Sequence, residues 1–169
     1  MDSSYNVGED NITRQVEFII ATASTFSHSS IGVIAYATDT QYLISPGNSS
    51  SFSEFANMLR NANYSMGKYK NLGKALTMAL EETKLFDETT ASVVVAMVAG
   101  KAEDDYAVPA SLLRQRGVTI IGLPLGSHYS MSQLNMLVTK PSEEHLLKAE
   151  FADLTHFIST TRNKICKGL

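Results

Sequence analysis

The 169-residue sequence predicts a single α/β domain, a doubly wound and mainly parallel sheet with helices on both faces. Strand-length apolar runs alternate with amphipathic helical patterns along the chain, as in folds of this class. The runs Ile31–Ala37, Ala91–Val98 and Val118–Leu123 carry no charged residue, as expected for strands buried on both faces. The chain is 44% hydrophobic and too short for two average domains, so one core is expected.

Helical periodicity fills the segments between these runs. Ile12, Val16 and Ile19 recur at three- and four-residue spacing and predict a helix over Asn11–Phe26, with Glu9 and Asp10 placed favourably for its dipole. The same reasoning predicts further helices at Phe52–Leu59, Leu72–Leu85, Asp104–Arg116, Ser130–Val138 and Ala152–Ile165.

Two shorter segments complete the predicted sheet. Thr40–Ser45 follows a short turn and is expected to pair antiparallel with Ile31–Ala37 at the sheet edge. His145–Lys148 is predicted to form a short strand. Ala91–Val98 is rich in valine, so we expect it at the centre of the sheet.

Composition excludes several classes of function. The net charge is −3 with both signs interspersed, which argues against binding to nucleic acid or an anionic membrane by bulk charge. The longest apolar stretches fall far below the roughly 20 residues of a membrane span. Cys166 is the single cysteine, so neither an internal disulfide nor a cysteine-based metal site can form.

The first residues of the chain carry oxygen atoms at alternate positions. Asp2, Ser4 and Asn6 supply a carboxylate, a hydroxyl and an amide just before the first helix. Such groups suit Mg²⁺, Ca²⁺ or Mn²⁺, and loops at the carboxyl edge of a parallel sheet are where open α/β folds place their sites. The alternative is an ordinary loop, because these residue types also favour turns and helix caps.

This segment resembles the Asp-x-Ser-x-Ser metal loop of von Willebrand factor type A domains, with Asn6 replacing the last serine. Further stretches resemble the family in the correct order: Ile31–Tyr36, Asn71–Leu76, Val94–Gly100 with Glu103–Asp105, and Leu113–Ile120. The tail from Leu134 to Lys167 is similar to the tandem domains of type VI collagens and related matrix proteins.

The resemblance implies a secreted module of the extracellular matrix or of cell adhesion. Its partners would be matrix proteins or neighbouring domains of a longer collagen-like chain, with no nucleic acid and no membrane insertion. A metal-dependent adhesion domain is the alternative. A hydrolytic or nucleotide-binding enzyme is disfavoured, because no phosphate loop is present and the histidines fall in different elements.

The chain departs from the family at two metal ligands. The family's threonine before the third helix aligns with Lys70, or with Tyr69 or Asn71 if the gap shifts by one position. The aspartate that ends its fourth strand aligns with Ala99. Losing an anion and gaining an ammonium both disfavour a divalent cation, so a degenerate site without a cofactor is expected, with Mg²⁺ or Mn²⁺ only if the site still binds. We expect the Lys70 ammonium to take the place of the cation by pairing with Asp2.

The family's first strand, which leads into the metal loop, is not matched by this sequence, because only Met1 precedes Asp2. That strand lies in the middle of the family's sheet, so its absence would leave long apolar edges on the strands either side. Residues 1–169 are therefore expected to be one domain truncated at its N-terminus.

Three sequons fit an extracellular origin. Asn11, Asn48 and Asn63 each precede a serine or threonine by two positions and are candidate glycosylation sites. Cys166 follows the last predicted core position, where it would be either a free thiol or paired with a cysteine outside this sequence.

Overall fold

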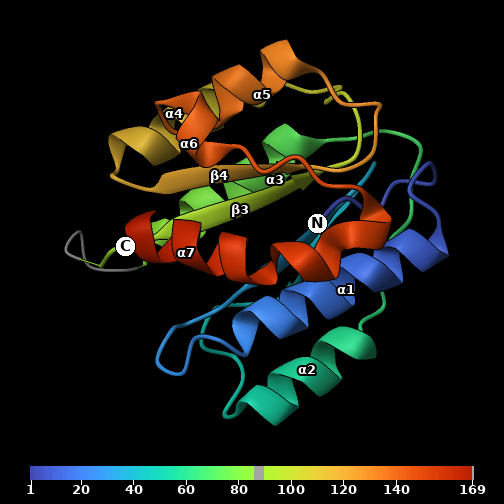
Figure 1. The fold of residues 1–169 in the computed structure, drawn as a ribbon, viewed down its shortest axis with the longest axis vertical. Coiled ribbons are helices and arrows are strands. Elements are labelled where there is room, and N and C mark those ends of the chain that lie inside the picture. The colour runs from blue at the N-terminus through green and yellow to red at the C-terminus, as the bar shows by residue number, and fades with distance from the viewer. Residues whose placement is uncertain (86–89, 169) are drawn as a thin grey trace.

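The computed structural model describes residues 1–85 and 90–168 and shows helices on both faces of a central sheet region (Figure 1). The elements in order are α1 (Glu9–Ala23), β1 (Val33–Tyr36), β2 (Thr40–Ile44), α2 (Phe52–Arg60), α3 (Leu72–Thr83), β3 (Val93–Val98), α4 (Ala107–Gln115), β4 (Thr119–Pro124), α5 (Met131–Leu137), α6 (Ser142–His145), the 3-10 helix η1 (Phe151–Phe157) and α7 (Ile158–Gly168). The predicted doubly wound α/β class is confirmed.

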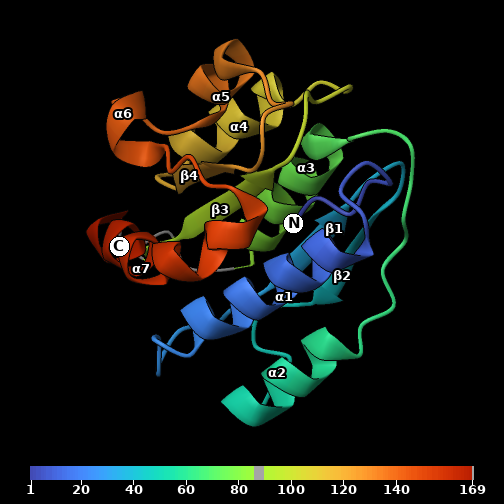
Figure 2. The same cartoon turned by 45° about the vertical axis from the view of Figure 1, so that its right-hand side comes forward.

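The named strands form two separate pairs. β1 pairs antiparallel with β2, as predicted, and β3 pairs parallel with β4. Between the pairs lies the start of the chain, and Figure 2 shows the N-terminus inside the molecule, between β1 and β3. This start runs parallel to β1, because the Tyr36 amide donates to the Met1 carbonyl at 3.0 Å and the Ser3 amide donates to the Tyr36 carbonyl at 2.9 Å.

The prediction of a strand at His145–Lys148 was partly wrong. His145 ends α6, whose residues are helical. The next residues do run along the far edge of β4, where the Leu147 amide donates to the Gly122 carbonyl at 2.9 Å and the Ala149 amide to the Pro124 carbonyl at 3.1 Å. The predicted helix Ala152–Ile165 is present as η1 followed by α7.

The apolar residues of these elements fill two neighbouring clusters. One gathers around α1, α2 and β1, and the other lies between α3, α4 and the β3–β4 pair. β4 is the most buried strand, with Ile120, Ile121 and Leu123 fully inaccessible. Helix packing on both faces therefore holds the two strand pairs in one body, and the loops at their carboxyl ends converge at one edge.

Candidate functional site

Asp2 is the centre of this edge and is fully buried. Its carboxylate accepts two backbone hydrogen bonds: Oδ1 from the Ser4 amide at 3.0 Å, and Oδ2 from the Ala99 amide at 3.3 Å. Ala99 follows β3, so Asp2 links the first loop to the end of that strand. Both carboxylate oxygens are already engaged by the chain's own peptide groups.

Gln15 of α1 fixes the backbone of Asp2. Its Oε1 accepts from the Asp2 amide at 3.2 Å, and its Nε2 donates to the Asp2 carbonyl at 2.9 Å. Gln15 is fully buried, so no water can replace these bonds. The sequence analysis missed this residue. The sequence pattern that could have identified Gln15 is a polar residue on the apolar helix face that carries Ile12 and Val16.

The other predicted ligands have different surroundings. The Ser4 side chain is buried, and its Oγ has no hydrogen-bond partner among the described residues. Asn6 is exposed. The loop itself is firmly placed, since the Tyr5 amide donates to the Gly67 carbonyl at 2.8 Å and Ser3 Oγ donates to the Ser65 carbonyl at 3.0 Å.

Lys70 lies in the neighbouring loop and is only 8% exposed. Its backbone is tied to Glu103: the Lys70 amide donates to Glu103 Oε2 at 2.9 Å, and the Glu103 amide donates to the Lys70 carbonyl at 3.1 Å. Its side chain packs on Gly100, where an added Cβ would lie 2.4 Å from Lys70 Cε. Lysine thus occupies the space that glycine leaves open at the end of β3.

The predicted ion pair between Lys70 and Asp2 is wrong. Across residues 1–85 and 90–168, the ion pairs within 4 Å do not include it. The methylene carbons of the Lys70 side chain pack against Gly100. The Asp2 carboxylate instead accepts hydrogen bonds from the Ser4 and Ala99 amides. The two loops meet at Ala99–Gly100, but their charges are held by different partners.

The remaining acidic side chains of this edge hold helix ends. Asp104 accepts from the Gly73 amide at 2.8 Å and from the Lys74 amide at 2.9 Å, which caps α3. Asp105 Oδ1 accepts from the Ala107 amide at 3.0 Å at the start of α4. A carboxylate at a helix N-terminus satisfies orphan amides and complements the helix dipole. Sequence analysis anticipated Asp105 as a helix starter but not the role of Asp104 on a different helix.

The charge of Asp2 also acts on Tyr36. Burial, followed by the negative charges of Asp2 and Asp104, raises the pKa of Tyr36 well above its ordinary value of 10.0. The Tyr36 hydroxyl therefore stays protonated at physiological pH, and it donates to the Met97 carbonyl at 2.8 Å.

The predicted ligand set offers little negative charge to a divalent cation. The Asp2 carboxylate is the one anion of the predicted ligand set and already accepts two amides, and a buried lysine lies in the adjoining loop. The described residues contain no group of three His, Cys, Asp or Glu side chains placed to hold a metal. Calcium and magnesium sites need several oxygen ligands with enough negative charge to offset dehydration.

The predicted modification sites are spread over the surface. Asn48 and Asn63 are exposed in loops, whereas Asn11 lies in α1 and donates from Nδ2 to the Val7 carbonyl at 3.0 Å. Cys166 is an exposed free thiol on α7. Glycosylation at the three asparagines remains a prediction.

The family model described as the von Willebrand factor type A domain matches residues 1–160. The chain belongs to this family. Its similar relatives include the collagen alpha-1(XXI) chain of Xenopus laevis (21% identical), human cochlin (24%) and mouse matrilin-2 (25%), each matched over at least 99% of this chain. These are matrix proteins that contain the domain. The chain spans 18%, 31% and 19% of their respective lengths.

Solved structures show the same fold. Proximal thread matrix protein 1 from the mussel byssus superposes with a TM-score of 0.84 at 18% identity, covering 98% of this chain and 44% of that one. Another structure of that mussel protein has a zinc-occupied metal-ion-dependent adhesion site (MIDAS) and superposes with a TM-score of 0.81 at 19% identity, covering 98% of this chain and 43% of that one. None of the helices within residues 1–85 and 90–168 has the length and apolar character needed to cross a bilayer.

Proposed function

We propose that this domain is a protein-binding module of the extracellular matrix that acts without a bound metal. The observation that carries the proposal is the low negative charge of the predicted ligand set: Asp2 is its one anion and already accepts the Ser4 and Ala99 amides, and the buried Lys70 lies in the adjoining loop. The matrix relatives support secretion and partners in the matrix or in a longer collagen-like chain. Those relatives also disfavour an enzyme.

The contact surface that we assign is the rim of the same edge. Tyr5 is 62% exposed and Tyr69 is 47% exposed, and their loops are joined by the hydrogen bond from Tyr5 to Gly67. Lys68 Nζ lies 5.7 Å from the centre of the Tyr69 ring, which places a cation beside an aromatic face. Tyrosines with exposed rings on a firmly placed loop are typical anchors of protein interfaces.

A metal-dependent adhesion domain is the second candidate. The buried Ser4 hydroxyl without a partner favours it, because an unpaired buried oxygen is costly and a cation would satisfy it. The two candidates differ in one measurable property, since a ligand that binds the folded state raises its stability by mass action.

The test is thermal unfolding of the domain with millimolar Mg²⁺ or Mn²⁺ and with EDTA. We expect the unfolding temperature to be the same in all three conditions. The double variant Ala99→Asp with Lys70→Thr is the matched control and should acquire a rise of several degrees with Mn²⁺. A comparable rise in the unmodified domain would establish the metal-dependent alternative instead.

The surface assignment is tested separately by binding to immobilised fibrillar collagen in EDTA. Tyr5→Ala and Tyr69→Ala should each weaken binding at least tenfold. Phe52→Ala removes a 48% exposed ring on α2 and should leave binding unchanged. If all three variants bound collagen equally well, Tyr5 and Tyr69 would not belong to the binding surface.

A further inference from the structure

Half of the exposed large hydrophobic side chains among the described residues lie on two neighbouring helices, α4 and α5. α4 packs against α3, β4 and α5, and Figure 2 shows it on the far side of β3 and β4 from α1 and α2. Its exposed pair is Val108, 57% exposed, and Leu112, 41% exposed. Residues four positions apart lie one above the other on a helix, so α4 presents an apolar stripe to solvent.

An acidic and a basic side chain stand at the two ends of this stripe. Asp105 lies beside Val108, because its Oδ1 accepts from the Ala107 amide at 3.0 Å and from the Val108 amide at 3.4 Å. Arg116 lies one turn beyond Leu112, because its amide donates to the Leu112 carbonyl at 3.1 Å. Both charged side chains are exposed. The order along α4 is therefore an anion, two apolar side chains and a cation.

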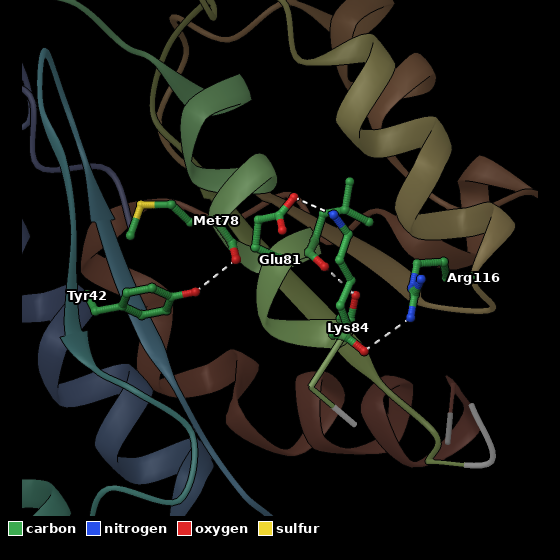
Figure 3. Close-up of polar contacts among 7 residues, drawn as sticks. Tyr42, Met78, Glu81, Lys84 and Arg116 are labelled. Carbon is green, nitrogen blue, oxygen red and sulfur yellow. Dashed lines mark hydrogen bonds and ion pairs between the residues drawn. The ribbon is translucent and has the colours of Figure 1, made fainter. Parts of the chain in front are cut away.

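The neighbouring charged side chains are held by other partners. Arg114 turns toward α5, where its Nη1 donates to the Leu137 carbonyl at 2.6 Å. On α3, Glu81 and Lys84 form an ion pair with each other at 2.6 Å (Figure 3). Arg116 Nη2 donates to the carbonyl of the last residue of α3 at 3.4 Å. Because a guanidinium carries five donors, this bond leaves Arg116 able to bind a second acceptor.

We propose that the α4 stripe binds the same stripe on a second copy of this chain, with the two helices antiparallel about a two-fold axis. Asp105 of each copy then meets Arg116 of the other, and Val108 packs against Leu112. Both pairs have their midpoint near Ala110, so one axis satisfies them together. A parallel arrangement would place like charges opposite each other, which is unfavourable.

The charge order of the stripe is the reason to choose a second copy over a different protein. A two-fold interface brings a surface against itself, so that surface must be complementary to itself. A stripe with one sign of charge at each end meets this requirement only when it is paired antiparallel. This inference does not rest on the proposed function, because the stripe lies on α4 and the tyrosine rim lies on other loops.

The contact is small, so the dimer should be weak. Stable protein interfaces bury about 1,200–2,000 Å², which is more than one pair of short helices supplies. We expect a dissociation constant of about 0.1–1 mM. Weak contacts of this kind become effective when several copies are held close together.

The first test is sedimentation equilibrium of the 169-residue chain from micromolar to millimolar concentration. The average mass should rise toward that of a dimer, and Leu112→Glu should weaken the association about tenfold or more. Phe52→Glu is the matched control, because it changes a 48% exposed ring on α2 and should leave the association unchanged. A monomer at every concentration, or equal weakening by the two variants, would overturn the proposal.

A reciprocal charge swap tests the antiparallel arrangement. Asp105→Lys and Arg116→Glu each place like charges together at both ends of the dimer, so each variant alone should associate about tenfold more weakly. An equimolar mixture of the two variants restores opposite charges at both ends and should associate as strongly as the unmodified chain.

The mixture also separates the charge effect from a change in folding. Asp105→Lys removes the cap of α4, but that loss persists in the mixture and cannot produce the recovery. A mixture that associates no more strongly than either variant alone would overturn the antiparallel pairing.

Discussion

The loops at the carboxyl edge and the side of β3 that faces away from β4 differ in how their polar groups are satisfied. At the edge, Gln15 pairs with both peptide groups of Asp2, and the Asp2 carboxylate caps two amides from separate loops. Among the described residues, the peptide groups of β3 that face away from β4 have one side-chain partner, the Tyr36 hydroxyl, which donates to the Met97 carbonyl.

The difference shows how each region satisfies its backbone groups. Side chains from distant segments can satisfy isolated backbone groups, and the edge uses Gln15, Asp104 and Glu103 for this purpose. A row of backbone groups spaced along a strand needs another strand. The edge should therefore respond to single side-chain changes, and the segment beside β1 to the charge of the Met1 amino group.

The largest effect is expected from Gly73→Ala at the edge. A Cβ on Gly73 would lie 2.0 Å from the Asp105 carbonyl oxygen and 2.9 Å from Asp104 Oδ2, so α3 must move away from its cap. We expect a loss of about 3 kcal/mol or more in the free energy of unfolding, measured with urea. Gly117→Ala is the control, because its φ of +79° adds strain but no atom lies within 4 Å of the new Cβ. It should cost only about 1–2 kcal/mol. Equal losses in the two variants would show that the edge is not tightly packed.

The next effect concerns the glutamine that clamps Asp2. Gln15→Leu keeps the side-chain volume but leaves the Asp2 amide and carbonyl buried without partners, which should cost about 2–3 kcal/mol. Gln133 is a natural control, because its amide clamps Ala102 in the same way at 2.9 and 3.1 Å but is only partly buried. Gln133→Leu should cost about 1 kcal/mol, since water can replace the lost partners. Chemical denaturation of both variants measures the difference, and a larger loss for Gln133→Leu would contradict it.

The smallest effect is a pH dependence at the Met1 amino group, which donates to the Ile34 carbonyl of β1. Burial lowers the pKa of the Met1 amino group from 8.0 to about 6, partly offset by the Asp2 charge. Between pH 6 and 8 the unfolded chain then binds more protons than the folded chain, so the free energy of unfolding should rise with pH, by about 2 kcal/mol. Urea denaturation across this range measures the slope. N-terminal acetylation removes the ionisable group and should flatten it, and an unchanged slope after acetylation would assign the effect to other groups.

The fold was largely predictable because each element carries its own periodicity. Helices α1 and α3 and strands β3 and β4 follow from apolar spacing and valine-rich runs. The short segment after α6 was harder, because the pairing of Leu147 and Ala149 with β4 is set by contacts to residues far away in the chain.

The site was predictable in position but not in its bonds. Sequence placed Asp2, Lys70 and Ala99 in converging loops, and the structure brings those loops together. It could not predict that Lys70 would pack on Gly100 and leave Asp2 to backbone amides, because both depend on side-chain directions. Gln15 was overlooked because its partner lies 13 positions away.

The anchoring of α3 on both strand pairs has a mechanical consequence. Within residues 1–85 and 90–168, the contacts that link α3 to both strand pairs include the bonds from Tyr42 to Met78 and from Arg116 to Thr83 (Figure 3). A force that moves one strand pair relative to the other therefore reaches α3 through single side-chain bonds, which yield one after another, whereas a continuous ladder must break many hydrogen bonds together.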